Sequence, residues 1–207
     1  MTDWPEIFFA RHGETDWNAA GRFQGRMDIP LNEKGQRQAD AIGPVLVSLL
    51  ASRGMDPAAL AWHASPLSRA RETMQRARSA FDSALPPVRY DDRLMELAYG
   101  VMEGQHFRDV DMGIEMQSGK RDEDYWEFRP PEGENYHDLT RRLTEFAKTL
   151  TGPSIIVAHG GVQRALRRLT VGTPVVELVN WMPPQGAIAH FHDGQMDMHH
   201  APGFEPA

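Results

Sequence analysis

The sequence predicts an α/β protein: a three-layer α/β/α sandwich with a mostly parallel central sheet and an antiparallel edge strand. Three short apolar segments are each followed by a pattern typical of a helix: 6–10, 60–64 and 154–158. Such alternation predicts a sheet covered on both faces. Residues 188–192 and 195–199 flank Asp193–Gly194, a dipeptide typical of hairpin turns, which predicts an antiparallel strand at the edge.

Residues that begin and end helices lie beside these strands. Asn32 is expected to cap a long helix that ends near Gly54, and Pro44 is expected to kink it. Ser65–Pro66 predicts the N-cap and first residue of a second helix over 67–80.

The rest of the chain contains one clear amphipathic helix and one irregular segment. Residues 136–150 place apolar side chains on one helical face, and another helix is expected to run from the strand at 154–158 through Leu169. Residues 88–90 are a weak strand candidate. With no repeat or linker, the sequence predicts a single domain over 1–207, in which residues of about 97–135 form a cap segment.

Composition excludes several classes of function. The 207 residues contain no cysteine, which excludes disulfides, thiolate catalysis and cysteine-based zinc sites. A net charge of −7 argues against nucleic-acid binding, and an anionic ligand therefore requires a locally positive pocket. The N-terminus does not resemble a signal peptide and no apolar run is long enough to span a membrane, so we expect a cytoplasmic protein with no membrane partner.

Histidine and arginine residues follow the predicted parallel strands. The first strand leads into Arg11 and His12, the second into a helix that carries Arg69, and the third into His159 and Gly160. Ligands of open α/β sheets bind beyond the carboxyl ends of the strands. Two histidines and two arginines, far apart in sequence, are therefore expected to converge there.

This set of side chains suits phosphoryl transfer. Arginine matches the oxygens of a phosphate with paired N–H donors, and the Gly160 amide at a helix start favours an anion. A neutral His12 can attack phosphorus and form a phosphohistidine, which divides one difficult displacement into two steps. A protonated His159 would stabilise charge on the phosphoryl oxygens in the transition state.

The leaving alkoxide needs a proton, and a carboxylic acid at the rim of the pocket is its natural donor. Glu96 is the leading candidate, while Glu14, Glu103 and Asp92 are alternatives, since an exposed carboxylate is usually only solvated.

Five ordered blocks resemble the signature of the histidine phosphatase superfamily, the phosphoglycerate-mutase-like group. The resemblance spans about residues 7 to 170. The blocks are Arg11-His12-Gly13-Glu14-Thr15 with Trp17-Asn18, Gly21-Arg22, Gln24-Gly25 and Pro30-Leu31; Ala64-Ser65-Pro66-Leu67-Ser68-Arg69-Ala70; Leu94 to Glu96 with Gly100 and Glu103-Gly104; Pro131-Glu132-Gly133-Glu134; and Val157-Ala158-His159-Gly160-Gly161.

The resemblance implies a mixed sheet between helices and catalysis without a metal or other cofactor. It implies that His12 is the phosphorylated nucleophile, that Arg11 and Arg69 bind the phosphate, and that His159 is the second histidine of the pocket.

The resemblance also implies that Asn18 and the Gly160 amide bind phosphate and that Glu96 donates the proton. Asparagine often serves only to stabilise a turn, so Asn18 has that alternative role. Gln24 either contacts the substrate or is an ordinary polar loop residue.

Three basic residues of the cap segment are weak candidates for recognising the rest of the substrate: Lys120, Arg121 and Arg129. A charged run is more often a solvated surface, and that alternative stays open.

Four histidines near the C-terminus are His190, His192, His199 and His200. Strand alternation puts the first two on one face, which an ordinary edge strand also allows. Without a cysteine or organised carboxylates nearby, no metal site is expected there.

The resulting hypothesis is a metal-independent phosphatase that hydrolyses a small phosphorylated metabolite through phospho-His12. A cofactor-dependent phosphoglycerate mutase is the first alternative, although the segment 120–134 is mostly acidic where such mutases are basic. A non-catalytic phosphate-binding module is the second. Apolar residues of 175–184 form either the interface of a homodimer or part of the core.

Overall fold

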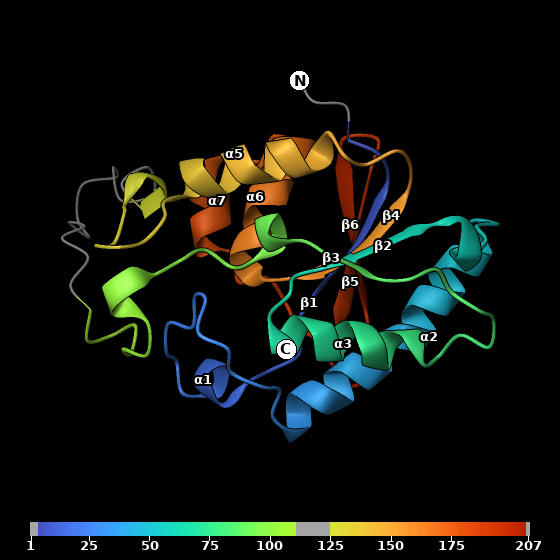
Figure 1. Ribbon diagram of the computed structural model, residues 1–207, viewed down its shortest axis with the longest axis horizontal. Coiled ribbons are helices and arrows are strands. Elements are labelled where there is room, and N and C mark those ends of the chain that lie inside the picture. Colours follow the sequence, from blue (N-terminus) through green and yellow to red (C-terminus); the bar gives the residue numbers. More distant parts are fainter. Residues whose placement is uncertain (1–3, 111–124, 206–207) are drawn as a thin grey trace.

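The computed structural model describes residues 4–110 and 125–205. At its centre is a six-stranded sheet in the order β3-β2-β4-β1-β5-β6 (Figure 1). Strands β1 to β4 pair in parallel, whereas β5 pairs antiparallel with β1, and β6 with β5. The predicted mostly parallel sheet with an antiparallel edge is confirmed. The strands are β1 (Ile7–Arg11), β2 (Ala61–Ala64), β3 (Arg89–Tyr90), β4 (Ser154–Ala158), β5 (Ala187–His192) and β6 (Gln195–His200).

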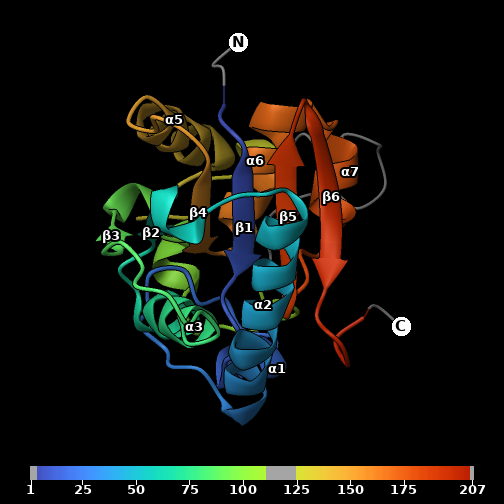
Figure 2. The ribbon, with the colours of Figure 1, turned by 90° about the vertical axis from the view of Figure 1, so that its right-hand side faces the viewer.

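Helices cover both faces of this sheet (Figures 1 and 2). Helices α2 and α3 pack on one face, and α5, α6 and α7 pack on the other. The helices are α1 (Asp16–Ala19), α2 (Glu33–Ser52), α3 (Ser68–Arg78), α5 (Tyr136–Ala147), α6 (Gly160–Val171) and α7 (Val175–Asn180), with single 3₁₀ turns at Pro57–Ala59, Asp92–Leu94 and Gly100–Met102.

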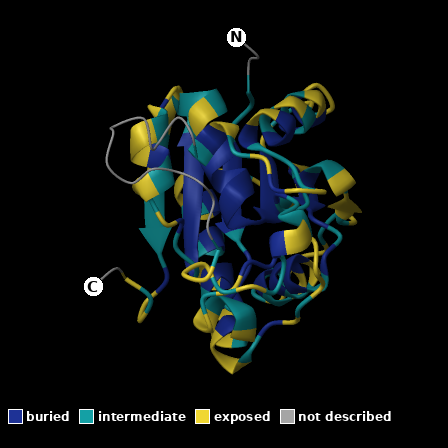
Figure 3. Ribbon diagram, turned by 90° about the vertical axis from the view of Figure 1, so that its left-hand side faces the viewer, coloured by how far each residue is buried: buried dark blue, intermediate teal, exposed yellow. Residues whose placement is uncertain are grey.

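Alternation along the central strand β1 produces the three layers. Ile7 and Phe9 belong to the core beneath α5 and α6, whereas Phe8 and Ala10 belong to the core beneath α2 and α3. All four are buried, because β1 lies between β4 and β5 and has helices on both sides. Figure 3 shows the buried strands between helices whose outer surfaces are exposed.

Most of the predicted helix and turn signals act as expected. The Asn32 side chain caps α2 by accepting a hydrogen bond from the Gly35 amide at 2.8 Å. Helix α2 continues through Pro44 to Ser52, and the kink stays a prediction. Asp193 and Gly194 have positive φ angles, 47° and 72°, as a two-residue hairpin turn requires.

The predicted N-cap at Ser65 is wrong. Helix α3 begins at Ser68 and its N-cap residue is Leu67, which has no capping side chain; the Asp28 carboxylate accepts from the Ser68 amide at 2.8 Å instead. The reason is long-range: the Ser65 hydroxyl lies 2.7 Å from Nε2 of His159, so it contributes to the site. The short helices α1 and α7 were also missed, since four and six residues are too few to show a periodicity.

Two glycines pack the loop after β1 directly against α2. A methyl group on Gly13 would overlap the Gly35 carbonyl, and one on Gly35 would overlap the Glu14 carbonyl. Backbone therefore lies on backbone behind His12, which fixes the loop that carries it. Within residues 4–110 and 125–205, no helix has the length and apolar composition needed to cross a membrane.

Candidate active site

A pocket of about 240 Å³ lies beyond the carboxyl ends of β1 and β4. Seven of the eight predicted site residues line it: Arg11, His12, Asn18, Gln24, Arg69, Glu96 and Gly160. The eighth, His159, is completely buried behind the wall, and its ring centroid lies 5.1 Å from that of His12. The structure therefore brings the predicted residues together.

The tautomer of His12 follows from the one side-chain hydrogen bond that its ring makes with the described residues. Nδ1 lies 2.7 Å from the Gly13 carbonyl oxygen, which can only accept, so Nδ1 carries the hydrogen. In the neutral ring the lone pair is then on Nε2. Burial, followed by the charges of Arg69 and Arg11, holds the pKa of His12 well below its ordinary value. His12 is therefore a neutral imidazole at physiological pH, the form that can attack phosphorus.

His159 is also neutral in this pocket. Burial lowers its pKa well below the ordinary value, and Arg69 and His12 lower it further. The sequence argument gave this residue a role that requires protonation. A low-dielectric site next to arginines opposes that protonation, and a bound phosphate dianion would favour it. Its Nδ1 is buried and has no partner within the described residues.

The two expected phosphate-binding arginines are anchored by neutral groups. Arg11 donates to the Pro183 carbonyl at 2.7 Å, and Arg69 donates to the carbonyls of Met27 and Gly25 at 2.8 Å. The Nε atoms of both are buried without a partner in the described structure. Burial lowers the pKa of Arg11 to about 10. Because carbonyls do not neutralise a guanidinium, an anion in the pocket would be strongly favoured.

Asn18 combines the two roles that sequence reasoning left open. Its Oδ1 accepts from the Thr15 amide at 3.3 Å in a capping box at α1, and from Gln185 Nε2 at 3.1 Å. With Oδ1 occupied, the side-chain NH₂ remains for a ligand in the pocket. Gln185 also donates to the His12 carbonyl and was missed. Gln185 lies two residues before β5, which starts where the neighbouring antiparallel strand β1 ends, so strand pairing could have found it.

Among the candidate carboxylates, Glu96 is the one that reaches the pocket. It accepts from the Leu97 amide at 2.9 Å and from the Gly161 amide at 3.1 Å. A methyl group on Gly161 would overlap this carboxylate, which explains the second glycine of the His-Gly-Gly sequence.

The other carboxylates have structural partners elsewhere. Glu14 pairs with Lys34, and Glu103 accepts from the amides of Arg26 and Tyr99. Asp92 lies in the 3₁₀ turn Asp92–Leu94. None of these three lines the pocket.

Two further arginines line the pocket and were missed. Arg164 donates to the Trp181 carbonyl at 2.9 Å and contacts the Tyr136 hydroxyl at 3.4 Å, and it is 8% exposed. It follows Gly160 by four residues on α6, a spacing that could have revealed it. Arg22 donates to the Gly104 carbonyl. The remaining wall is aromatic and apolar: Phe23, Tyr99, Phe107, Tyr125, Val179 and Met182.

Of the three basic residues of the cap segment that were candidates for substrate recognition, the structure describes Arg129. Arg129 forms an ion pair with Asp138 at the start of α5 and does not line the pocket. Lys120 and Arg121 lie outside the described residues. In the 175–184 segment, Leu178 is buried, whereas Val176 and Met182 are 52% and 64% exposed; a homodimer through this segment stays a prediction.

Comparison with known proteins identifies the family of this chain. Residues 7–197 match the model of the histidine phosphatase superfamily, branch 1. The chain belongs to this superfamily. A metal-independent phosphoserine phosphatase of Arabidopsis thaliana is 35% identical over 190 residues, which cover 84% of this chain and 73% of the plant protein.

Other relatives carry mutase names. A 2,3-bisphosphoglycerate-dependent phosphoglycerate mutase of Gloeobacter violaceus is 31% identical, over 77% of this chain and 73% of its own length. Among solved structures, a phosphoglycerate mutase of Thermus thermophilus superposes with a TM-score of 0.71 and 27% identity, covering 95% of this chain and 98% of the other. The superfamily therefore includes both phosphatases and mutases among the relatives of this chain.

The two neutral histidines predict that acid destabilises the protein. In the unfolded chain each histidine binds a proton below about pH 6.5, while in the folded protein His12 and His159 stay neutral. The free energy of unfolding is therefore expected to fall by up to about 1.4 kcal/mol per pH unit for each of them as the pH decreases below 6.5.

Denaturant unfolding between about pH 6.5 and 4.5 in a phosphate-free buffer measures this dependence. His12→Gln is expected to reduce the slope of the unfolding free energy against pH by the contribution of one proton. His137→Gln, which replaces an exposed histidine on α5, is the control. Equal slopes for the wild type and His12→Gln would show that His12 is not held neutral.

Proposed function

We propose that this protein hydrolyses a small phosphomonoester through a phosphohistidine on His12. The observation that carries the proposal is the convergence of an unprotonated nucleophile, buried arginines and one carboxylate on a single pocket. The Nδ1–H of His12 is bound to Gly13, so its Nε2 lone pair is available to the substrate. The excess of positive charge among the side chains that line the pocket suits a phosphate dianion.

In the first step, His12 Nε2 attacks phosphorus, a P–N bond forms and the ester P–O bond breaks. Arg11, Arg69, the Gly160 amide and the Asn18 side-chain NH₂ bind the phosphoryl oxygens. The carboxyl group of Glu96 gives its proton to the leaving alkoxide.

In the second step, water attacks the phosphoenzyme. Glu96, now a carboxylate, takes a proton from that water, the P–N bond breaks and inorganic phosphate leaves. His12 returns to its neutral form and Glu96 to its acid form. His159, hydrogen-bonded to Ser65, takes up a proton from solvent as the phosphate dianion enters the pocket, stabilises the charge on the phosphoryl oxygens, and returns the proton when phosphate leaves.

The rest of the pocket fits a small phosphorylated metabolite. Arg22 and Arg164 also line the pocket and suit a second polar or anionic group. Gln24 is 6% exposed and its Oε1 has no partner in the described structure. These two observations favour a contact between Gln24 and the substrate over the alternative of an ordinary polar loop residue. No nucleic acid or membrane is part of this proposal.

Phosphoglycerate mutase activity is the second candidate, because relatives at about 30% identity carry that name. The two reactions share the phosphoenzyme and differ in what accepts the phosphoryl group. With 3-phosphoglycerate and a trace of 2,3-bisphosphoglycerate, a mutase forms 2-phosphoglycerate faster than it releases phosphate. We expect phosphate release to predominate. A non-catalytic binding module is disfavoured, because the chain has a histidine at the position of the nucleophile, arginines at the phosphate-binding positions and a glutamate at the position of the proton donor.

Replacement of His12 tests the proposed hydrolysis. With a chromogenic phosphomonoester and EDTA, we expect the wild type to release phosphate and His12→Ala to lose activity by at least about 10³-fold, since it removes the nucleophile. A metal-dependent reaction would stop in EDTA. Equal turnover by His12→Ala, or no hydrolysis of any compound in a panel of phosphorylated metabolites, would contradict the proposal.

Replacement of Glu96 tests the proton donor. We expect Glu96→Gln to slow hydrolysis of an alkyl phosphate by about 10²–10⁴-fold, and to slow formation of the phosphoenzyme from p-nitrophenyl phosphate much less, because nitrophenolate leaves without a proton. Rapid-quench measurement of phosphoenzyme formation gives both values. Glu14→Gln, a carboxylate outside the pocket, is the matched control. Equal losses with both substrates would assign Glu96 a different role.

A further inference from the structure

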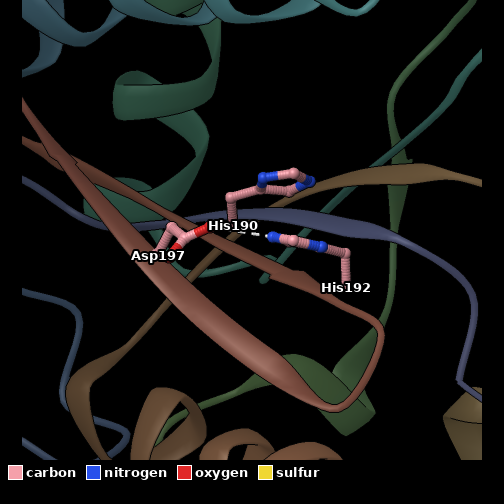
Figure 4. Close-up of side chains that lie close together, drawn as sticks. All are labelled: His190, His192 and Asp197. Atoms are coloured by element: carbon pink, nitrogen blue, oxygen red, sulfur yellow. Dashed lines mark hydrogen bonds and ion pairs between the residues drawn. The ribbon is translucent and has the colours of Figure 1, made fainter.

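A cluster of histidine and carboxylate groups lies on the β5–β6 hairpin, at the end of the sheet opposite the pocket. His190 pairs with Asp197 across the two strands, and His192 lies two residues further along β5 (Figure 4). Alternation puts all three side chains on one face of the sheet. One ligand atom from each lies within 4.8 Å of the other two.

These three donors have the composition of a transition-metal site. Two imidazole nitrogens and a carboxylate oxygen, with water as the fourth ligand, suit tetrahedral Zn²⁺, whereas Mg²⁺ and Ca²⁺ prefer all-oxygen ligands. We propose that His190, His192 and Asp197 bind a Zn²⁺ ion on this hairpin. No site was expected from the sequence, which shows no organised carboxylates near these histidines; the strand pairing supplies Asp197.

A fourth residue orients the first histidine. His190 Nε2 lies 2.6 Å from Glu6 Oε1, so the carboxylate accepts the Nε2 hydrogen and the lone pair is on Nδ1. Carboxylates that hold a metal-binding histidine in this way fix its tautomer and its ring orientation. Arg53 forms an ion pair with the same Glu6 at 2.7 Å and so holds that carboxylate in position.

Packing holds the rings in place before any ion arrives. The His190 side chain is 1% exposed and stacks on Phe8 at 4.5 Å and on His192 at 4.3 Å. His192 Nε2 lies 2.8 Å from Asp197 Oδ2. Zn²⁺ would replace the proton shared by these two atoms, so that binding releases one proton from the cluster.

The site is independent of the proposed phosphatase. His190 pairs with Phe8 near the start of β1, whereas His12 follows the end of that strand. Zn²⁺ would connect β5 to the edge strand β6, which has no further partner in the sheet. Its expected effect is therefore to stabilise this edge and not to take part in phosphoryl transfer.

Isothermal titration of the EDTA-treated, dialysed full-length protein with ZnCl₂ tests the proposal. We expect one saturable equivalent in the wild type, with the affinity weakened at least about tenfold in His192→Ala and in Asp197→Asn. His137→Ala is the matched control, because His137 also pairs with a glutamate, Glu127, but belongs to no cluster of three possible metal ligands within the described residues. This control is expected to bind as the wild type does.

Two further measurements keep the result unambiguous. Bound Co²⁺ should show the visible spectrum of a tetrahedral site in the wild type and lose it in Asp197→Asn, while circular dichroism reports intact folding. Absence of saturable Zn²⁺ binding, or equal affinity in the wild type and His192→Ala, would overturn the proposal. Neither outcome depends on whether the protein is a phosphatase.

Discussion

The hydrogen bond from His12 Nδ1 to the Gly13 carbonyl is the contact on which the site depends. It fixes the tautomer and leaves the lone pair on Nε2, while burial and the charges of Arg69 and Arg11 lower the pKa and keep the ring neutral. The bond requires the loop after β1 to lie in one position, which the close packing of Gly13 against Gly35 provides. Strand β1, buried on both faces, gives that loop a rigid base.

Charge is the second constraint. The chain has 29 acidic and 22 basic residues, yet its pocket contains four arginines and, within the described residues, one carboxylate. The arginines are held by backbone carbonyls and a phenol instead of by acidic side chains, so their charge remains available to a ligand. Burial, followed by the charges of these arginines, lowers the pKa of both histidines. Binding of a dianion would relieve this repulsion, which couples recognition of phosphate to catalysis.

Sequence periodicity predicted the strands, the long helices and the convergence of Arg11, Arg69 and His159, since parallel strands present their carboxyl ends at one edge. It failed where a residue's role depends on distant partners. Ser65 has the pattern of an N-cap but contacts His159, 94 residues away. Arg164 and Asp197 looked like ordinary helix and strand residues until α6 and β6 were placed against their neighbours. The aromatic wall depends on how the cap segment folds, which no local pattern determines.

Identification of the nitrogen that carries the phosphoryl group is the most direct test of His12 as the nucleophile. Because Nδ1 is bound to Gly13, the phosphoenzyme should contain Nε2-phosphohistidine at His12. Brief reaction with substrate, denaturation in alkali, and ³¹P NMR or mass spectrometry of the isolated peptide distinguishes the two isomers. The Nε2 isomer at His12 is the predicted result. Phosphate on Nδ1, or on His159, would contradict the assignment of His12 Nε2 as the nucleophile.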